Sequence, residues 1–359
     1  MHSQGRRYSY FGGNDYLGLS GHQDIKQASI QSIIKYGVNF AASRRTTGTA
    51  DIHLELEKQL SVFKKNQDTV VFAAGYLGNS ILLEVLKNKY NAVFIDQFAH
   101  PSISGGVPRE TEKIYLYNHC DTLHLEKLLQ DNIKQRALVI TDGVFALTGE
   151  IAPLDKIYPL IQKFNAILVV DDAHSTGILG ANGRGTPEYF DLAEAANIYQ
   201  SETMSKAFGS YGGFISGDED IIRLIRDTST IYQASTAIPP PVVAAGIAAL
   251  KIINEDPARR IRVVSLAGDI RQKIMNLGFQ TTPDNTPIIP IMFSSYERAS
   301  ELSGFMENNG IIVPCVNYPV MHLKPMIRIT VTANHTNQQA ELLLELLNKW
   351  RDKKGTDYY

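Results

Sequence analysis

The feature that most constrains this chain is a repeated alternation of short apolar runs with segments long enough to form a helix. The runs are rich in Val, Ile, Leu, Phe and Tyr, and they are residues 69–72, 92–95, 113–117, 138–141, 167–170, 197–200 and 213–216. Short apolar runs separated by helical segments are typical of strands buried in a mainly parallel sheet. The sequence therefore predicts an α/β fold, with a mainly parallel central sheet covered by helices on both faces.

The segments on either side of these runs predict further helices and a second domain. Before the first run, apolar residues at helical spacing predict helices over 23–36 and 53–63. After three consecutive prolines at 239–241, the expected helices lie near 241–254, 257–276, 296–309 and 337–352, with apolar runs at 288–293 and 327–331. We expect an N-terminal segment over 1–20, a large domain over 21–240 and a small C-terminal α+β domain over 241–359.

Charge and cysteine content exclude several classes of function. The formal net charge is −2, so nothing favours a nucleic-acid or membrane-surface partner. Cys120 and Cys315 are the only cysteines, too few for a disulfide framework or a cysteine metal site, and they fit a reducing cytoplasm. The uncharged stretch between Asp227 and Lys251 contains prolines and polar residues, so we expect no membrane span. The first residues lack the apolar region of a signal peptide.

The most informative short segment is Asp171-Asp172-Ala173-His174, directly after the apolar run 167–170. Loops that follow parallel strands meet at one edge of the sheet, where ligands bind. A carboxylate there could be a metal ligand, a structural cap or the partner of a pyridinium nitrogen. No cluster with metal-ligand spacing lies nearby in the sequence, so no metal is expected. The pyridinium interpretation has a chemical reason, since a buried carboxylate keeps a ring nitrogen protonated and the cationic ring withdraws charge from a carbanion.

A lysine follows the next apolar run, in the segment Thr203-Met204-Ser205-Lys206-Ala207-Phe208-Gly209. An amine that forms an imine needs a fixed position, which a turn provides, although the alternative is an ordinary solvated loop lysine. Because Asp171 and Lys206 follow adjacent strand candidates, they are expected at the same sheet edge. The pair predicts pyridoxal 5′-phosphate as the cofactor, with Lys206 as its covalent anchor and Thr203 close to its phosphate.

Two further turns follow apolar runs at the same edge. Gly75 and Tyr76 open a helix after residues 69–72, and the N–H groups of such a turn suit a phosphate, although any tight turn also needs a glycine. The turn is not a GxGxxG motif, which disfavours a nicotinamide cofactor. His100 follows residues 92–95, where its ring could stack on an aromatic cofactor or form surface hydrogen bonds only.

Taken together, these motifs resemble one family, the α-oxoamine synthases, which are acyl-CoA-dependent enzymes of the fold-type I pyridoxal-phosphate class. The resemblance covers nearly the whole chain and rests on NDYLGL at 14–19, GYLGN at 75–79, the loop 96–100, VFALTGEIAPL at 144–154, VDDAHSTGILG at 170–180, TMSKAFG at 203–209, STAIPP at 235–240 and RITVTANH at 328–335. The number and order of the motifs make the resemblance specific. It implies the architecture of a fold-type I PLP-dependent transferase.

The resemblance also implies a role for each matching residue. Lys206 would bind the cofactor and then remove the α-proton of an amino acid. Asp171 would pair with the pyridinium nitrogen, His174 would hydrogen-bond the ring hydroxyl, and His100 would stack on the ring. The residues that match phosphate-binding positions are Gly75, Tyr76 and Thr203, and, for the phosphate of a neighbouring subunit, Ser235 and Thr236. Asn14 and Arg328 would hold the substrate carboxylate, and a homodimer with shared active sites is implied.

The reaction that the resemblance implies is a decarboxylative condensation of an amino acid with an acyl-CoA, which leaves an α-amino ketone. VDDAHSTGILG is closer to the 8-amino-7-oxononanoate synthases than to the 2-amino-3-ketobutyrate CoA ligases (glycine C-acetyltransferases), and a serine palmitoyltransferase-like activity is a further alternative. Ala146 stands where the family usually has a serine, so the acyl-CoA specificity stays open. An aminotransferase and a non-catalytic scaffold remain as alternatives of other classes.

Overall fold

The computed structural model describes residues 2–3, 5–316 and 323–355, which pack as two units. The first, here called the sheet unit, consists of residues 19–145 and 151–257. The second, the terminal unit, combines the described residues up to 18 with residues 146–150 and those from 258 onward. Each unit is thus built from segments that lie far apart in the sequence.

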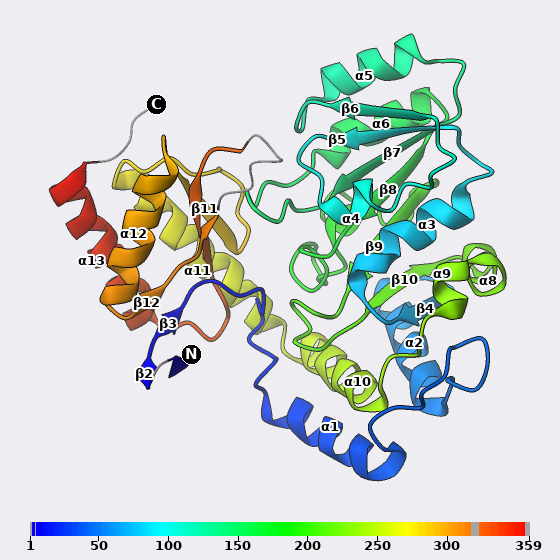
Figure 1. The fold of residues 1–359 in the computed structure, drawn as a ribbon, viewed down its shortest axis with the longest axis horizontal. Helices are drawn as coiled ribbons and strands as arrows, with labels where there is room; N and C mark the ends of the chain where they lie inside the picture. Colours follow the sequence, from blue (N-terminus) through cyan, green and yellow to red (C-terminus); the bar gives the residue numbers. More distant parts are fainter. Residues whose placement is uncertain (1, 4, 317–322, 356–359) are drawn as a thin grey trace. The chain divides into compact units, whose positions relative to one another are not determined.

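The sheet unit contains a seven-stranded sheet in the order β4-β10-β9-β8-β7-β5-β6 (Figure 1). Its strands are β4 (Asp68–Phe72), β5 (Ala92–Asp96), β6 (Lys113–Tyr117), β7 (Ala137–Asp142), β8 (Ile167–Asp171), β9 (Ile198–Thr203) and β10 (Gly213–Gly217). The strands β5 to β9 pair in parallel, and β10 runs antiparallel to both β4 and β9. The mainly parallel sheet is confirmed, and each apolar run predicted as one of its strands forms that strand.

Helices cover both faces of this sheet. The helices of the sheet unit are α1 (Gln23–Tyr36), α2 (Asp51–Lys64), the 3-10 helix η1 (Gly75–Leu77), α3 (Gly78–Leu86), α4 (Pro101–Ser104), α5 (Thr122–Asp131), α6 (Leu154–Lys163), α7 (Thr186–Tyr189), α8 (Glu219–Thr228), α9 (Thr230–Ala234) and α10 (Pro240–Glu255). Consecutive residues of a strand point to opposite faces. In β5, Val93 packs in one core cluster with Leu82 of α3, whereas Phe94 packs in a second cluster with Leu125 of α5. The predicted double coverage of the sheet is confirmed.

Helix α10 begins within the triple proline, because proline is tolerated in the first turn of a helix, where no intrahelical N–H bond is needed. It packs on α1 and α2, and its contact face buries the small residues Ala244, Ala245, Gly246 and Ala249. Small side chains let neighbouring helices approach closely. The helix therefore belongs to the sheet unit, and the packing units do not follow the predicted limits at residues 20 and 240.

The terminal unit has an α+β arrangement. It contains an antiparallel sheet in the order β11-β14-β13, and its elements are β11 (Ile288–Met292), β13 (Cys315–Val316), β14 (Met326–Thr330), α11 (Pro257–Asn276), α12 (Tyr296–Asn308) and α13 (Asn337–Lys354). Pro290 lies in the edge strand β11, where proline is tolerated. Two short pairs complete the unit, β1 (His2–Ser3) with β2 (Arg6–Arg7) and β3 (Ser9–Tyr10) with β12 (Ile311–Ile312). Among the helices that the structure describes, none is both long and apolar enough to cross a membrane.

Candidate active site

Asp171 and Lys206 follow two neighbouring strands at the same edge of the sheet. Asp171 is the last residue of β8 and pairs with Ser201 of the parallel strand β9, and Lys206 lies in the turn between β9 and β10. Burial lowers the pKa of His100, the charge of Asp171 opposes this shift, and the charge of Lys206 adds to it. His100 follows the end of β5, which is parallel to β7 and through it to β8, so the acid, the amine and the imidazole all lie at one edge of the sheet.

The carboxylate of Asp171 is buried and held from several sides. Asn79 Nδ2 donates to Asp171 Oδ2 at 2.6 Å, and the backbone N–H of Ala173 donates to Oδ1 at 3.1 Å. Asp171 is only 7% exposed. A carboxylate in this setting keeps a fixed direction, and its charge is little screened by water. It is suited to pair with a cationic ring nitrogen.

A chain of hydrogen bonds links this carboxylate to His100. Asn79 Nδ2 also donates to Ser102 Oγ at 3.0 Å, and Ser102 Oγ lies 2.7 Å from His100 Nδ1 and 3.4 Å from Asp171 Oδ2. The backbone N–H of Ser102 donates to the same Nδ1 at 3.2 Å. Nδ1 is therefore an acceptor, and the neutral ring carries its proton on Nε2. The residues that hold Asp171 also orient the imidazole.

A second buried carboxyl, Asp142, ends the neighbouring strand β7. Its Oδ2 accepts the backbone N–H of His100 at 2.9 Å. Burial raises the pKa of Asp142 well above its ordinary value, and the charge of Asp171 raises it further. Two neighbouring buried carboxyls do not both ionise easily. The neutral form of Asp142 therefore persists to a higher pH than it would in an exposed aspartate.

Asp172, the residue after Asp171, has a structural role instead. It is fully buried, and it accepts the backbone N–H of Thr186 at 2.9 Å, the hydroxyl of Thr186 at 2.6 Å and the hydroxyl of Ser175. These bonds attach the end of β8 to the start of α7. Asp172 is thus turned towards Thr186, and Asp171 is the acid that faces the His100 network.

The turn that carries Gly75 and Tyr76 forms a cradle next to Thr203. A Cβ atom on Gly75 would lie 2.5 Å from Thr203 Oγ1, so only glycine lets the backbone pass this close. The chain then continues through η1 into α3, and the N–H groups at a helix start favour an anion. This shape fits a phosphate group.

The hydroxyl of Thr203 is engaged within its own turn. It donates to Gly212 O at 3.0 Å and accepts the backbone N–H of Ser205 at 3.2 Å, with Ser205 Oγ at 2.7 Å. Thr203 is buried, whereas Ser205 is exposed. Ser205, which sequence reasoning did not single out, therefore adds a second and more accessible hydroxyl beside the predicted one.

Two further predicted residues, His174 and Tyr76, differ in exposure. His174 is buried in the turn after β8. Tyr76 is half-exposed, and its ring lies edge-on to the ring of His100 with 6.3 Å between the centroids. A cofactor bound at this edge would have the exposed Tyr76, beside His100, at the rim of its site.

Ser235 and Thr236 lie on the connection between α9 and α10. Ser235 Oγ donates to Ile231 O at 2.6 Å, and Thr236 forms an isolated β-bridge with Ser43. These contacts attach the two residues to α9 and to the loop before α2. Their expected role at the phosphate of a neighbouring subunit stays a prediction.

Arg328 and Asn14 lie together in the terminal unit. Arg328 Nη2 donates to Asn14 Oδ1 at 3.0 Å, Nε donates to Ala146 O at 2.6 Å, and Nη1 donates to Thr330 Oγ1 at 2.8 Å. All three acceptors are neutral oxygens, although Arg328 is only 6% exposed. A buried guanidinium with neutral partners favours an anionic ligand. The pair is suited to bind a carboxylate.

Sequence reasoning missed Asn79, Ser102 and Asp142. Asn79 is the last residue of the GYLGN segment, and Asp142 ends an apolar run just as Asp171 does. Asp142 could therefore have been identified from its position at the end of a predicted strand. Ser102 has no signal of its own, because serine is common in loops.

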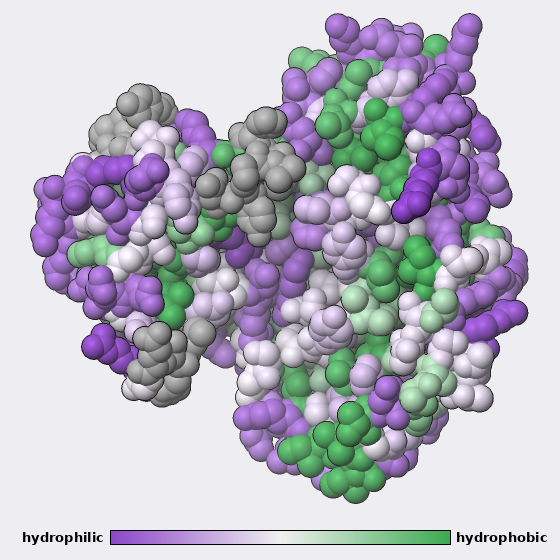
Figure 2. Space-filling view, in the orientation of Figure 1, coloured by the Kyte–Doolittle hydropathy of each residue, from purple (hydrophilic) through white to green (hydrophobic). Residues whose placement is uncertain are grey.

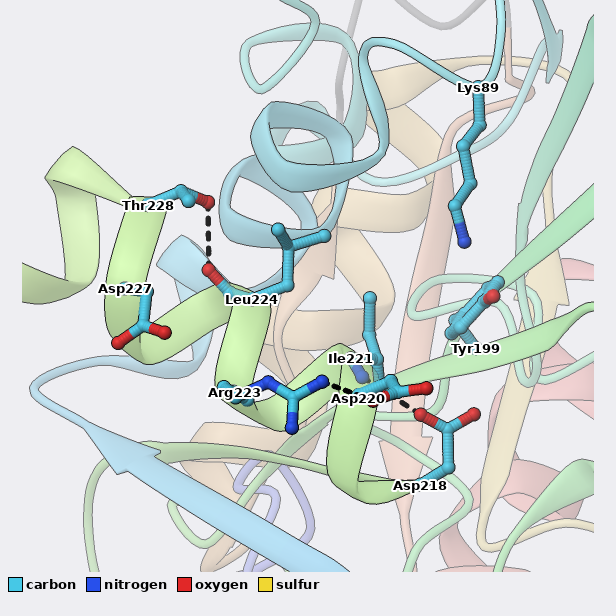
Figure 3. Close-up of a pocket in the computed structure, with 9 residues that line it drawn as sticks. All are labelled: Lys89, Tyr199, Asp218, Asp220, Ile221, Arg223, Leu224, Asp227 and Thr228. Carbon is cyan, nitrogen blue, oxygen red and sulfur yellow. Dashed lines mark hydrogen bonds and ion pairs between the residues drawn. The ribbon is translucent and has the colours of Figure 1, made fainter.

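A separate cavity of about 420 Å³ lies beside α8 (Figure 3). Three of its charged residues are engaged, since Asp218 accepts the backbone N–H of Ile221 at 2.8 Å and Arg223 forms an ion pair with Asp220. None of the residues predicted for the active site lines it. We regard this cavity as a surface feature of α8.

Comparisons with known proteins indicate one family. A model of the aminotransferase class I and II family matches residues 9–347. An 8-amino-7-oxononanoate synthase of Thermoanaerobacter pseudethanolicus is 35% identical over 340 residues, which are 94% of this chain and 86% of that relative. A serine palmitoyltransferase from S. paucimobilis, solved with bound PLP and myriocin, matches with a TM-score of 0.92 at 26% identity and covers 98% of this chain and 89% of that one. An 8-amino-7-oxononanoate synthase from Francisella tularensis matches with a TM-score of 0.83 at 26% identity, over 97% and 98% of the two chains.

Proposed function

We propose that this chain, which belongs to the aminotransferase class I and II family and within it to the α-oxoamine synthases, condenses an amino acid with an acyl-CoA. The reaction releases CoA and CO2 and leaves an α-amino ketone. The names of the relatives favour 8-amino-7-oxononanoate as the product. The observation that carries the proposal is the buried, oriented carboxylate of Asp171 at the end of β8, beside the strand that leads to Lys206.

The residues of the sheet unit fit pyridoxal 5′-phosphate as the cofactor. The cradle at Gly75, with the hydroxyls of Thr203 and Ser205 nearby, would hold the phosphate. Asp171 and His100 would hold the ring, and Lys206 would form the covalent link. When bound, this cofactor withdraws the electron pair that is left on the α-carbon of an amino acid.

The protein's own residues then orient groups and move protons. Lys206, in the turn between β9 and β10, would take the α-proton of the amino acid. Asp171 would stabilise positive charge on the ring nitrogen, and the hydrogen bond from Asn79 holds the direction of its carboxylate. We assign binding of the amino acid's carboxylate to Arg328 and Asn14, whose hydrogen bond at 3.0 Å makes them one unit. Their fixed geometry lowers the entropy cost of binding.

We further propose a homodimer that uses the face around α1. Ile34 and Val38 are 72% and 70% exposed, and Figure 2 shows an apolar patch over the lower end of the sheet unit, where α1 lies in Figure 1. A groove of about 540 Å³ lies on α1, α2 and α10, where Ala28, Ile52, Ala244, Ile247 and Ala248 form its apolar part and Gln59, Lys251, Asn254 and Glu255 its polar part. Monomeric proteins rarely leave such patches uncovered, and most oligomers are symmetric dimers of identical chains.

The proposed reaction is tested with a panel of small amino acids crossed with acyl-CoA substrates of different chain length. Free CoA is measured by chromatography, and the amino ketone is identified by its mass, with 8-amino-7-oxononanoate as the first product to seek. We expect CoA release that depends on both substrates. If the protein instead converts its cofactor stoichiometrically to the pyridoxamine form with an amino acid alone, it is an aminotransferase and the proposal is wrong.

A further inference from the structure

A second group of reactive side chains, none of which was given a role above, lies at the ends of β5 and β6. Asp96 ends β5, and His119 and Cys120 follow the end of β6. The two strands pair in parallel, with Asp96 opposite Tyr117, so the sheet brings the three residues together. One carboxylate oxygen of Asp96, one ring nitrogen of His119 and Sγ of Cys120 all lie within 4.8 Å of one another.

The carboxylate of Asp96 orients the other two residues. It is 2% exposed, and it accepts His119 Nδ1 at 3.0 Å and the backbone N–H groups of Cys120 and Phe98, each at 2.8 Å. Because a carboxylate of this kind only accepts hydrogen bonds, the proton of the imidazole must lie on Nδ1. The other ring nitrogen, Nε2, therefore carries a lone pair.

That lone pair faces the thiol of Cys120. Cys120 Sγ lies 3.7 Å from His119 Nε2, within hydrogen-bond distance for sulfur. The ring is also fixed by packing, since it stacks on Phe98 with centroids 4.5 Å apart and meets Phe145 edge-on at 4.3 Å. The thiol, the imidazole and the carboxylate are arranged as in an activated nucleophile. The imidazole is the base, and the carboxylate orients it.

We propose that Cys120 is a nucleophilic thiol, deprotonated by His119 and oriented through Asp96, that exchanges with low-molecular-weight disulfides. In the exchange the thiolate sulfur attacks one sulfur of the disulfide, a new S–S bond forms and the old one breaks. The other sulfur leaves as a thiolate and takes the proton from the His119 imidazolium, so no further oxidant is needed. Cys120 is half-buried and therefore partly accessible. The assignment does not depend on the proposed function.

A metal site would use the same three residues less well. Both oxygens of Asp96 already accept backbone N–H groups, and one also accepts the imidazole. A metal ion would have to replace the hydrogen bond between Asp96 and His119. The three residues would also supply only three of the four ligands of a structural zinc site. The geometry thus favours a nucleophile over a metal centre.

The chain offers a matched control in Cys315, its only other cysteine. Cys315 is also half-buried, but burial raises the pKa of its thiol. The variants C315S and C120S therefore each keep a single half-buried thiol. C315S keeps Cys120, beside an imidazole, and C120S keeps Cys315, whose pKa is raised by burial. Any difference in reactivity reports the surroundings of the sulfur.

The test follows the reaction of the full chain with 5,5′-dithiobis(2-nitrobenzoic acid) between pH 5 and pH 9. We expect C315S to react at least about tenfold faster than C120S at pH 6, because a thiolate paired with imidazolium persists below the ordinary thiol pKa. The double variant C315S/H119Q should lose this advantage. The proposal is overturned if C315S reacts only as an ordinary thiol above about pH 8, or if H119Q leaves its profile unchanged.

A structural defect and a metal site are separated by two further measurements. Should H119Q fail to fold, the pH profile of C315S alone decides, since it needs no change at His119. Addition of one equivalent of Zn²⁺ tests for a metal centre. If the protein binds Zn²⁺, C120S abolishes the binding and C315S exchanges slowly with disulfides, the proposal that Cys120 is a nucleophile is overturned.

Discussion

Asn79 donates a hydrogen bond of 2.6 Å to Asp171, and the same amide group donates to Ser102 at 3.0 Å. One fully buried side chain in the first turn of α3 thus orients the acid at the end of β8 and, through Ser102, the ring of His100. The acid therefore owes its direction to a helix that is distant in the sequence. This dependence gives Asn79 a positioning role that can be measured.

Replacing Asn79 by alanine should lower kcat by about ten- to a hundredfold, because a buried hydrogen bond to a charged group contributes about 1.5–3 kcal/mol. The absorbance spectrum of the bound cofactor should change as well, since Asp171 would lose its fixed direction. Asn88→Ala, which changes an exposed asparagine just after the end of α3, is the control. An unchanged kcat and spectrum in Asn79→Ala would remove the positioning role.

Replacing Lys206 by alanine should abolish the covalent adduct that borohydride reduction traps between protein and cofactor. No other lysine is expected to replace it, because the adduct needs an amine next to the residues that hold the ring. The measurement is peptide mapping by mass spectrometry after reduction. Lys87→Ala, which changes an exposed lysine, should keep the adduct. An adduct mapped to a different lysine in the wild-type protein would contradict the assignment.

Replacing Arg328 by lysine should raise the KM for the amino acid by about tenfold or more, since a planar guanidinium with several donors is replaced by a point charge. The KM for the acyl-CoA should change less. Arg328 is buried, so the thermal unfolding of the variant must be recorded to separate binding from folding. Arg223→Lys, at an exposed position of α8, serves as the control. Equal effects on both KM values would argue against a carboxylate-binding role.

His335 should make the protein less stable in mild acid. Its ring stacks on Phe11 with centroids 3.9 Å apart, its Nδ1 accepts the backbone N–H of Thr332, and burial lowers its pKa to about 4. The unfolded chain binds this proton near pH 6.5, so stability is lost as the pH falls from 6.5 towards 4, by up to about 3 kcal/mol. Urea unfolding across this range should show the loss, and His335→Gln should flatten it. A wild-type slope equal to that of the variant would contradict the linkage.

Replacing Ile34 by glutamate should shift the protein from dimer to monomer. The side chain is 72% exposed on α1, so a charge there costs little in the monomer but would be buried unpaired in the proposed interface. Light scattering after size-exclusion chromatography measures the mass in solution. The substitution Leu123→Glu, at an exposed position of α5, should leave the dimer intact. Wild-type protein that is monomeric at all concentrations would remove the proposed dimer.

The sequence by itself determined the strands and most of the helices, because both depend on local patterns. The apolar runs from 69–72 to 213–216 became β4 to β10, and the helix expected over 23–36 became α1. Strand ends are equally local, which is why Asp171, Lys206 and His100 could be identified as candidates before any coordinates.

Only the tertiary structure decided which side chains meet. Asp171, at the end of β8, is bound to Asn79, whereas Asp172 is bound to Thr186, and two adjacent aspartates in a sequence do not reveal which of them faces the site. Cys120 and its neighbour His119 meet the carboxylate of Asp96 only because β6 pairs with β5. Strand order and the direction of each side chain follow from packing between distant segments, and a pattern along the chain carries no record of that packing.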